Sequence, residues 1–346
     1  MEFGFYLPTH GPLAARQNLL RISEHAEKLE FDSMVAGDHV IAPINPTSQY
    51  PYSVGSEVPW DSSGEHLEMI TELAFLAAAT QHIKLVTSVM IVPHRNPILT
   101  AKMLSPLLKE NTMVVSAVNG LPWWYFYKSN NQYENMRLQS VDPKNQQWDY
   151  ITPERSLGCV VYPAAEIKAP GHVYHLEGDR FPLGEPDGSV SERAKTLSKI
   201  LINAGLKSPV RKTIRNDIWM KLWGNLAFNP ISALTGKTLE DIANNKKLCS
   251  IVEKMMLEGQ AVAKALGVNF PISLEKRIDG TRNVGAHKTS TLQDLELGRP
   301  MEIDALTKSV SEAGKIVNIP TPTIDKIYDE IKAKAIEAGC YFDPNL

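Results

Sequence analysis

The chain has 346 residues, of which 43% are hydrophobic and 22% are charged, and its formal net charge is −3. This composition is typical of a globular protein with room for roughly two domains, and it gives no reason to expect a nucleic-acid or membrane partner. The three cysteines, Cys159, Cys249 and Cys340, lack metal or redox spacing, so we expect free thiols, no metal and a cytoplasmic protein.

The first zone, to about residue 105, alternates strand-like and helix-like segments. The strand GFYLP is followed by a helix over residues 14–29, and a second amphipathic helix, HLEMITELAFLAAAT, precedes the strand IKLVTSVMIV. Between these two units lies a long loop at residues 41–64, which follows the C-terminal end of a strand. Repeated β-α units with short connections predict a parallel sheet with right-handed crossovers.

The second zone continues this pattern and then changes. A helix, PILTAKMLSPLLKE, leads to the strand TMVVSAV, and the turn Asn119-Gly120 precedes an aromatic run from Trp123 to Tyr127 that we expect to pack in the core. Short strands joined by Gly and Pro turns follow. From about Ser189 onward the pattern is helical, with Gly267 and Gly339 expected just beyond two helix ends.

One helix combines polar side chains with poor helix formers. In NDIWMKLWGNLAFNP, Lys221, Asn225 and Asn229 are four residues apart, so they drift only about 80° around the helix and share one face. A lysine with two amides can bind, orient and protonate a carbonyl compound, because the pKa of its ammonium falls on burial. The alternative is an amphipathic helix with a polar stripe facing water.

Three motifs from about residue 107 to the C-terminus resemble the ketopantoate reductase family, which reduces 2-dehydropantoate with NADPH. They are PLLKENTMVVSAVNG, then IWMKLWGNLAFNPISALTG, then HKTSTLQDLELGRPMEIDAL. The resemblance implies a small oxo-acid substrate and a place in pantothenate biosynthesis. The oligomeric state, with a homodimer as one option, stays open.

The resemblance also implies roles for six residues. Lys221 is the general acid for the ketone, and Asn225 and Asn229 hold the lysine and the substrate. Asn119 lies beside nicotinamide and substrate, and Ser290 and Glu302 bind polar groups of the substrate. Taken singly, Asn119 is also explained as part of a turn, Ser290 as a cap of the helix TLQDLELG, and Glu302 as a solvated neighbour of that helix.

Residues 1 to about 105 resemble a second family, the luciferase-like monooxygenases, which are (β/α)₈ barrels that use reduced flavin or coenzyme F420. The motifs are EHAEKLEFDSMVAGDHVIAP and LEMITELAFLAAATQHIKLVTSVMIVPHRNPILTAKML. The resemblance implies that Asp38 and His39 line the flavin pocket and that Thr87 lies on a strand facing it. The alternative for His39 is a histidine at the end of a loop.

Each resemblance lacks a part that its family needs. No G-x-G-x-x-G turn, which would hold the NADPH pyrophosphate, occurs in the sequence, and the later barrel strands have no counterpart. We therefore expect an α/β front, in which a partial TIM-barrel-like part joins an incomplete Rossmann-like sheet, followed by an all-α C-terminal domain. The expected boundaries are 1–105, 106–205 and 206–346.

Three functions are compatible with this reading. The first is a ketopantoate reductase-like oxidoreductase, favoured by the longer match and the fuller set of site residues. The second is a luciferase-like flavin- or F420-dependent monooxygenase, and the third is a non-catalytic fusion. At the junction, near residues 103–108, the pattern is compatible with one right-handed β-α-β unit made of IKLVTSVMIV, the helix through Leu104 and TMVVSAV.

Overall fold

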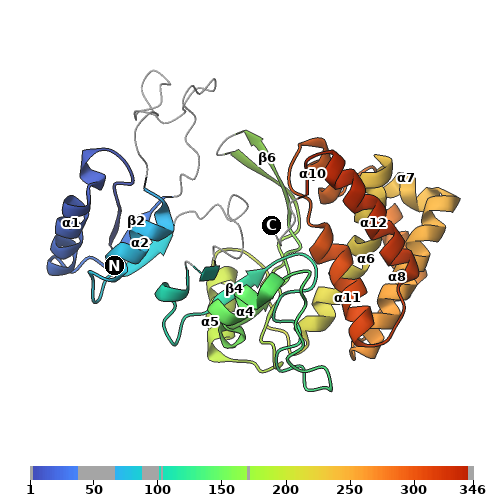
Figure 1. The fold of residues 1–346 in the computed structure, drawn as a ribbon, viewed down its shortest axis with the longest axis horizontal. Helices are drawn as coiled ribbons and strands as arrows, with labels where there is room; N and C mark the ends of the chain where they lie inside the picture. The colour runs from blue at the N-terminus through green and yellow to red at the C-terminus, as the bar shows by residue number, and fades with distance from the viewer. Residues whose placement is uncertain (1–2, 38–66, 88–100, 103, 170–171, 342–346) are drawn as a thin grey trace. The chain divides into compact units, whose positions relative to one another are not determined.

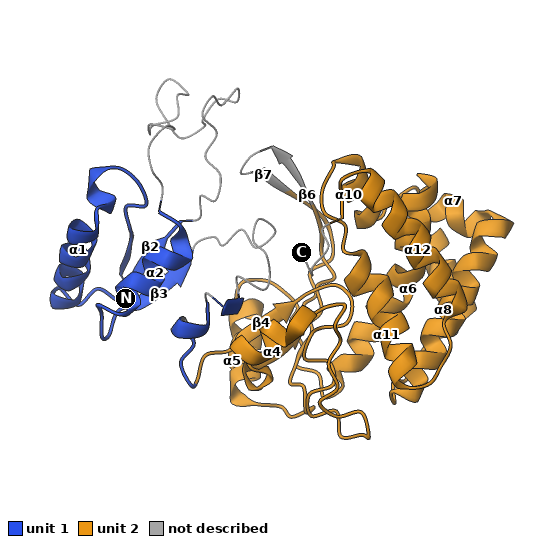
Figure 2. Ribbon diagram, viewed as in Figure 1, with its two compact units in different colours: residues 1–110 blue, residues 111–346 orange. Residues whose placement is uncertain are grey.

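The structure is a computed structural model that describes residues 3–37, 67–87, 101–102, 104–169 and 172–341. The chain divides into two compact units, residues 1–110 (unit 1) and residues 111–346 (unit 2), as Figure 2 shows. The further boundary predicted near residue 205 stays a prediction. In the described ranges no helix has both the length and the apolar character needed to cross a membrane.

Unit 1 is an α/β unit built on a small parallel sheet (Figure 1). Its elements are β1 (Gly4–Tyr6), α1 (Arg16–Lys28), β2 (Ser33–Ala36), α2 (Met69–Ala77) and β3 (Lys84–Thr87), with 3-10 turns at Pro12–Ala14 and Ser105–Leu107. The strands pair in chain order, β1 with β2 and β2 with β3, and both pairs are parallel as predicted. Consecutive parallel pairing of this kind needs a crossover after each strand, and α1 provides the first.

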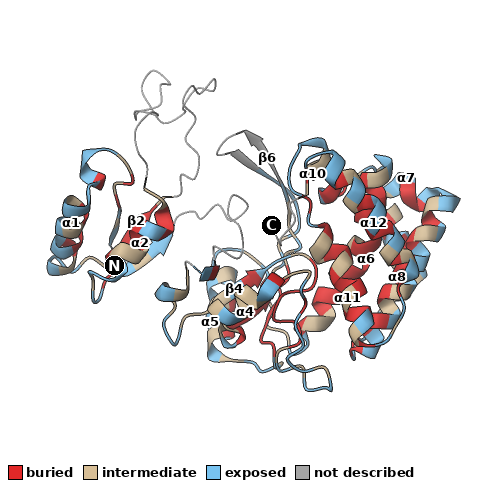
Figure 3. Cartoon of the chain, in the orientation of Figure 1, coloured by how far each residue is buried: buried red, intermediate tan, exposed pale blue. Residues whose placement is uncertain are grey.

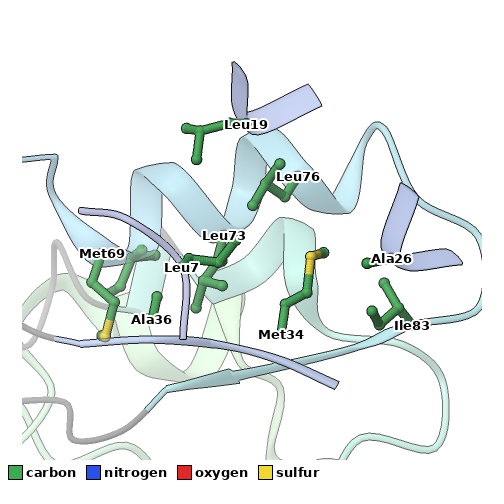
Figure 4. Packing of buried hydrophobic residues seen from close by; sticks show 10 residues of the cluster. Leu7, Leu19, Ala26, Met34, Ala36, Met69, Leu73, Leu76 and Ile83 are labelled. Carbon is green, nitrogen blue, oxygen red and sulfur yellow. The ribbon is translucent and has the colours of Figure 1, made fainter. Parts of the chain in front are cut away.

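The core of unit 1 lies between the sheet and α2. Met34 and Ala36 of β2 belong to one buried cluster with Met69, Leu73 and Leu76 of α2 (Figure 4). Alternate residues of β2 are buried, because successive side chains of a strand point to opposite faces of the sheet. The spacing of the apolar residues along α2 brings one face of that helix onto this layer.

A carboxyl group is buried in this apolar unit. Glu72, in the first turn of α2, is 3% exposed, and neither of its side-chain oxygens has a hydrogen-bond partner among the described residues. Burial raises the pKa of Glu72 to about 7. The folded unit therefore favours the neutral acid, whereas the unfolded chain releases the proton near the ordinary value of 4.5.

We expect Glu72→Leu to stabilise unit 1 at neutral pH. The folded pKa of Glu72 is raised, so its ionisation lowers the stability of wild-type unit 1 progressively from about pH 4.5 to about pH 7, by about 3 kcal/mol in all. Peptide-resolved hydrogen exchange of β1 to β3, corrected for intrinsic rates, would measure this at pH 5 and pH 8. Glu72→Gln is the matched control, because it removes the pH dependence but keeps a buried polar group. Equal protection of wild type at both pH values would contradict the prediction.

Unit 2 begins with a small mixed sheet and a hairpin. Its strands and first helices are β4 (Val114–Ala117), α4 (Gln146–Tyr150), β5 (Ser156–Cys159), β6 (Ala164–Ala169), β7 (His172–Glu177), β8 (Leu183–Gly184) and α5 (Glu192–Asn203). β4 pairs with β5 in parallel, β8 is antiparallel to β5, and β6 and β7 form an antiparallel pair. Among the described residues β3 and β4 belong to different sheets, so the β-α-β unit that the sequence allowed across the junction is not formed between these two strands. The reason is that β4 takes its hydrogen-bond partner from β5, which is later in the chain.

The aromatic run after β4 is part of the core of unit 2, as predicted. All four side chains from Trp123 to Phe126 are buried. The hydroxyl of Tyr125 accepts a hydrogen bond from the indole Nε1 of Trp219 at 2.7 Å, and Arg215 donates to the backbone carbonyl of Tyr125 at 2.9 Å. These bonds join the loop after β4 to the long helix that contains Trp219 and Arg215.

That helix, α6 (Ile214–Thr235), is the centre of the helical region, and it packs against α8, α10 and α12. The other helices are α7 (Leu239–Asn244), α8 (Lys246–Ala265), α9 (Leu274–Arg282), α10 (Ser290–Glu296), α11 (Ser309–Ile316) and α12 (Pro322–Glu337), and Asp304–Lys308 form a π-helical turn, η6. Figure 3 shows buried positions along most of α6. The protein is thus an N-terminal α/β region with small parallel sheets followed by a mostly helical C-terminal region.

Candidate functional site

The candidate site begins where two parallel strands end. Asn119 lies two residues beyond β4, and Val161 lies two residues beyond β5. Because β4 and β5 run parallel, their C-terminal ends meet at the same edge of the sheet. Ligands of open α/β sheets bind outside this edge.

Lys221 reaches this edge from α6. Its Nζ donates to the side-chain oxygen Oδ1 of Asn119 at 2.7 Å and forms a second, short hydrogen bond with the backbone carbonyl of Val161. An ammonium has three N–H donors, and the third has no acceptor among the described residues. One N–H of Lys221 is therefore available to a ligand.

Glu302 completes a chain of hydrogen bonds behind the lysine. The amide Nδ2 of Asn119 donates to Oε2 of Glu302 at 2.9 Å, across 183 residues of sequence. Asn119 therefore accepts from Lys221 with its oxygen and donates to Glu302 with its nitrogen, which fixes the orientation of its amide. The exposed carboxylate of Glu302 lies just before η6, where Asp304 accepts hydrogen bonds from the hydroxyls of Tyr328 and Tyr341 at 2.6 and 3.0 Å.

The turn that carries Asn119 packs directly on η6. Gly120 has a φ of +83°, and a Cβ atom at this position would lie 2.0 Å from the backbone oxygen of Ala305. Only glycine allows both this conformation and this contact. Single π-helical turns occur often at functional sites, and here the turn brings the Glu302 segment against the end of β4.

The charge on Lys221 is sensitive to its surroundings. Burial lowers the pKa of Lys221, and the charges of Glu302 and, to a smaller extent, Cys159 act in the opposite direction. Burial raises the pKa of the Cys159 thiol to about 11, so the thiol stays protonated at neutral pH. Glu302 is therefore the anion that offsets the desolvation of the ammonium.

Asn229 lies two helical turns beyond Lys221, and α10 provides its partners. Its Nδ2 donates to the hydroxyls of Ser290 and Thr291 at 3.4 and 3.2 Å. Ser290 is not the helix cap considered as an alternative above, because Thr289 is the N-cap and accepts from the amide of Leu292. Ser290 is therefore exposed on the first turn of α10, with its hydroxyl facing α6.

The remaining predicted residues are not part of this network. Asn225, between Lys221 and Asn229 on α6, is partly buried, and its amide has no hydrogen-bond partner among the described residues. Thr87, the last residue of β3, is exposed in unit 1. Asp38 and His39 lie outside the described residues. The structure thus brings together Lys221, Asn119 and Glu302, and separately Asn229 and Ser290.

Two contacts of the site were missed by the sequence reasoning. The carbonyl of Val161 carries no side-chain signal, although its position beyond a parallel strand could have suggested it. Thr291, the neighbour of Ser290, was not predicted, although its hydroxyl makes the shorter hydrogen bond to Asn229. Neither residue type has a chemistry that distinguishes it in a sequence.

The turn after β1 is the place where a Rossmann-like fold would hold a dinucleotide pyrophosphate. In the reductase family this turn carries glycines whose free amides bind phosphate. Here Pro8 and Pro12 have no N–H, and the amides of Ala14 and Ala15 already donate to the carbonyls of Gly11 and Pro12 at 3.0 and 3.4 Å. These residues do not fit the pyrophosphate of NADPH.

Known families match both parts of the chain. The profile of the ketopantoate reductase PanE/ApbA C-terminal family matches residues 213–335, which include five of the six predicted site residues. The profile of the luciferase-like monooxygenase family matches residues 1–107. Both resemblances inferred from sequence motifs are confirmed.

Comparison with individual proteins supports the match to the first of these families. The chain is 52% identical over 238 residues to a 2-dehydropantoate 2-reductase of Mesorhizobium japonicum. This alignment covers 69% of this chain and 73% of the relative. A crystal structure of a candidate ketopantoate reductase from Ralstonia solanacearum aligns with 98% of this chain and 99% of its own, at a TM-score of 0.70 and 29% identity. D-mandelate dehydrogenase, whose structure contains NADH, shares the fold at a TM-score of 0.60 and 15% identity.

Proposed function

Because the chain belongs to the ketopantoate reductase family, we propose that it reduces the carbonyl group of a small 2-oxo acid, 2-dehydropantoate, to a hydroxyl group. The observation that carries this proposal is the ammonium of Lys221. It is held by Asn119 and Val161 at the ends of two parallel strands, and one N–H remains for a ligand. A donor held in this way can bind the ketone oxygen and stabilise the charge that develops on it.

The proposed roles follow from the hydrogen bonds. Lys221 protonates the developing alkoxide, and burial makes its ammonium a stronger acid because it lowers the pKa. Asn119 orients the lysine, and Glu302 holds Asn119 and faces the polar end of the substrate. From the family resemblance, and not from a hydrogen bond in the case of Asn225, we also propose that Asn225, Asn229 and Ser290 bind the remaining polar groups of the substrate.

The reduction also needs a hydride, and NADPH is the cofactor that we propose from the family. The turn after β1 lacks the phosphate cradle, so we expect weak NADPH binding. Charge-assisted hydrogen bonds contribute about 1.5 to 3 kcal/mol each, and the loss of two of them lowers affinity by roughly 100-fold or more. We also propose a homodimer, as in the ketopantoate reductase of Staphylococcus aureus, and a cytoplasmic enzyme, which suits its three buried free thiols.

Calorimetric titration of the full chain with 2-dehydropantoate tests the proposal directly. We expect saturable binding that is weakened at least tenfold in Lys221→Met, since the ammonium is the donor to the ketone oxygen. The matched control is Lys254→Met, which removes an exposed lysine from α8. Absence of binding by the wild type would contradict the proposal and favour a non-catalytic fusion.

The pH dependence of the rate should report the charge of Lys221. The ammonium is the active form, so kcat/KM should fall as the pH rises through the lowered pKa of Lys221. Glu302 raises this pKa, so Glu302→Gln should move the fall in rate to lower pH. Initial rates between pH 6 and pH 10 would measure the fall in kcat/KM for the wild type and for Glu302→Gln. Glu337→Gln on α12 is the control. An unchanged profile in Glu302→Gln would argue against the assigned proton donor.

The match of residues 1–107 favours a second candidate, a flavin- or F420-dependent luciferase-like activity. Of its three predicted contacts only Thr87 lies among the described residues. Titration of the protein with flavin mononucleotide, followed by quenching of flavin fluorescence, distinguishes this candidate. Saturable binding at micromolar flavin would support it, and a linear response would dismiss it.

A further inference from the structure

The segment that carries Glu302 is anchored by its two neighbours in the chain. Met301 and Ile303 are buried in one apolar cluster with Tyr328 of α12. Glu302, between them, is exposed, and its carboxylate accepts a hydrogen bond from the amide of Asn119 at 2.9 Å. The packing of the neighbours therefore fixes the backbone from which the Glu302 side chain reaches Asn119.

Hydrogen bonds hold the same segment on both sides of Glu302. Before it, the backbone N–H of Met301 donates to the carbonyl of Cys340 at 2.9 Å. After it, the side-chain oxygen Oδ2 of Asp304 accepts from the hydroxyl of Tyr341 at 3.0 Å. The adjacent residues Cys340 and Tyr341 thus bind the chain one residue before Glu302 and two residues after it.

Asp304, the first residue of η6, has both of its side-chain oxygens occupied. Besides the bond from Tyr341 to Oδ2, its Oδ1 accepts from the hydroxyl of Tyr328 at 2.6 Å. Burial, and after it the proximity of Asp304, raises the pKa of both phenols, so both stay protonated and can donate. Ammonium groups lie over both rings, that of Lys308 at 4.8 Å from the centroid of Tyr328 and that of Lys332 at 4.8 Å from the centroid of Tyr341. Hydrogen bonds to a carboxylate are about twice as strong as those between neutral groups, so the two phenols stabilise the position of η6.

A second carboxylate repels Glu302. Asp294 of α10 is partly buried, and burial raises its pKa; the charge of Glu302 adds to this increase, whereas Arg299 opposes it. Because like charges repel, the exposed Glu302 side chain would turn away into solvent if its backbone were free to move. The anchors on either side of Glu302 oppose this movement.

We propose that Asp304 and Tyr341 are positioning residues, which hold the carboxylate of Glu302 against the amide of Asn119. The inference rests on the proposed function, in which Glu302 holds Asn119 and Asn119 orients Lys221. Among the described residues, the groups whose charges act on Lys221 are Glu302 and, to a smaller extent, Cys159. An effect of Tyr341 on the charge of Lys221 must therefore pass through Glu302.

The pKa of Lys221 tests this assignment, because its measurement needs neither substrate nor cofactor. In protein labelled with ¹³C-lysine, the Cε signal that is lost in Lys221→Met belongs to Lys221, and its titration gives the pKa. We expect a lower pKa in Tyr341→Phe than in wild type, in the same direction as in Glu302→Gln, because the displaced carboxylate raises the pKa less. Tyr150→Phe is the matched control, since it removes the hydroxyl of a partly buried tyrosine of α4, and it should give the wild-type pKa.

A double variant separates positioning from a general loss of stability. When Glu302→Gln is already present, Tyr341→Phe should not lower the pKa of Lys221 further, because both changes act through the same carboxylate. Equal pKa values in wild type and Tyr341→Phe, or an equal decrease with and without the Glu302 carboxylate, would overturn the assignment. Either result leaves the proposed function standing, since that function fails only if wild type does not bind 2-dehydropantoate.

Discussion

Replacement of Lys221 by methionine is expected to lower kcat/KM for 2-dehydropantoate by about 100- to 10,000-fold, the usual contribution of a general acid. Methionine fills similar space but cannot donate a proton or a hydrogen bond. It also leaves the acceptors on Asn119 and Val161 without their donor. Steady-state rates at fixed NADPH would measure the loss, and Lys254→Met should retain wild-type rates.

The fold of Lys221→Met must be intact for this comparison to be valid. Near-UV circular dichroism reports on Trp219 and Trp223, which are buried in the same helix. A variant with a wild-type spectrum and a wild-type rate would remove Lys221 from the mechanism. A variant with a wild-type spectrum and a rate reduced by the expected factor would support it.

Gly120→Ala should strongly reduce both the stability of unit 2 and its activity. The new Cβ would meet the backbone oxygen of Ala305 at 2.0 Å, and alanine disfavours the φ of +83°. Since neither backbone segment can move without shifting Asn119 or Glu302, we expect a loss of about 3 kcal/mol in the free energy of unfolding and a lower kcat/KM. Urea denaturation followed by tryptophan fluorescence would measure the first effect.

Gly205→Ala is the matched control for this variant. Gly205 has a similar φ of +87°, but a Cβ atom there would meet nothing within 4 Å. It should therefore cost only the conformational part, about 1 kcal/mol, and leave the rate unchanged. Equal losses in the two variants would mean that the contact with Ala305 does not constrain the turn.

The sequence predicted the parts of the site that follow local rules. The spacing of Lys221, Asn225 and Asn229 gave one face of α6, and the Asn-Gly turn gave the end of β4, because helix periodicity and turn chemistry act over a few residues. The contact between Asn119 and Glu302 spans 183 residues, and sequence periodicity carries no information on it.

The strand order of unit 1 does not decide between the two folds that the sequence suggests for it. The first three strands of a (β/α)₈ barrel pair in chain order, and so do the first three strands of a Rossmann sheet. The order β1-β2-β3 of unit 1 is therefore compatible with both folds. This explains how residues that match a luciferase-like profile can occur in a chain that aligns over 98% of its length with a reductase-like structure. Within this region a Rossmann fold would carry a glycine-rich turn after its first strand, and this chain has Pro8 and Pro12 there.

We therefore expect substrate binding at the proposed oxo-acid site in unit 2 together with weak binding of the cofactor phosphates after β1. A matrix of initial rates with 2-dehydropantoate and NADPH, each varied up to millimolar concentration, tests this combination most directly. We predict that the rate saturates with 2-dehydropantoate but rises linearly with NADPH throughout. Saturation by micromolar NADPH, or no turnover at any concentration of either compound, would contradict it.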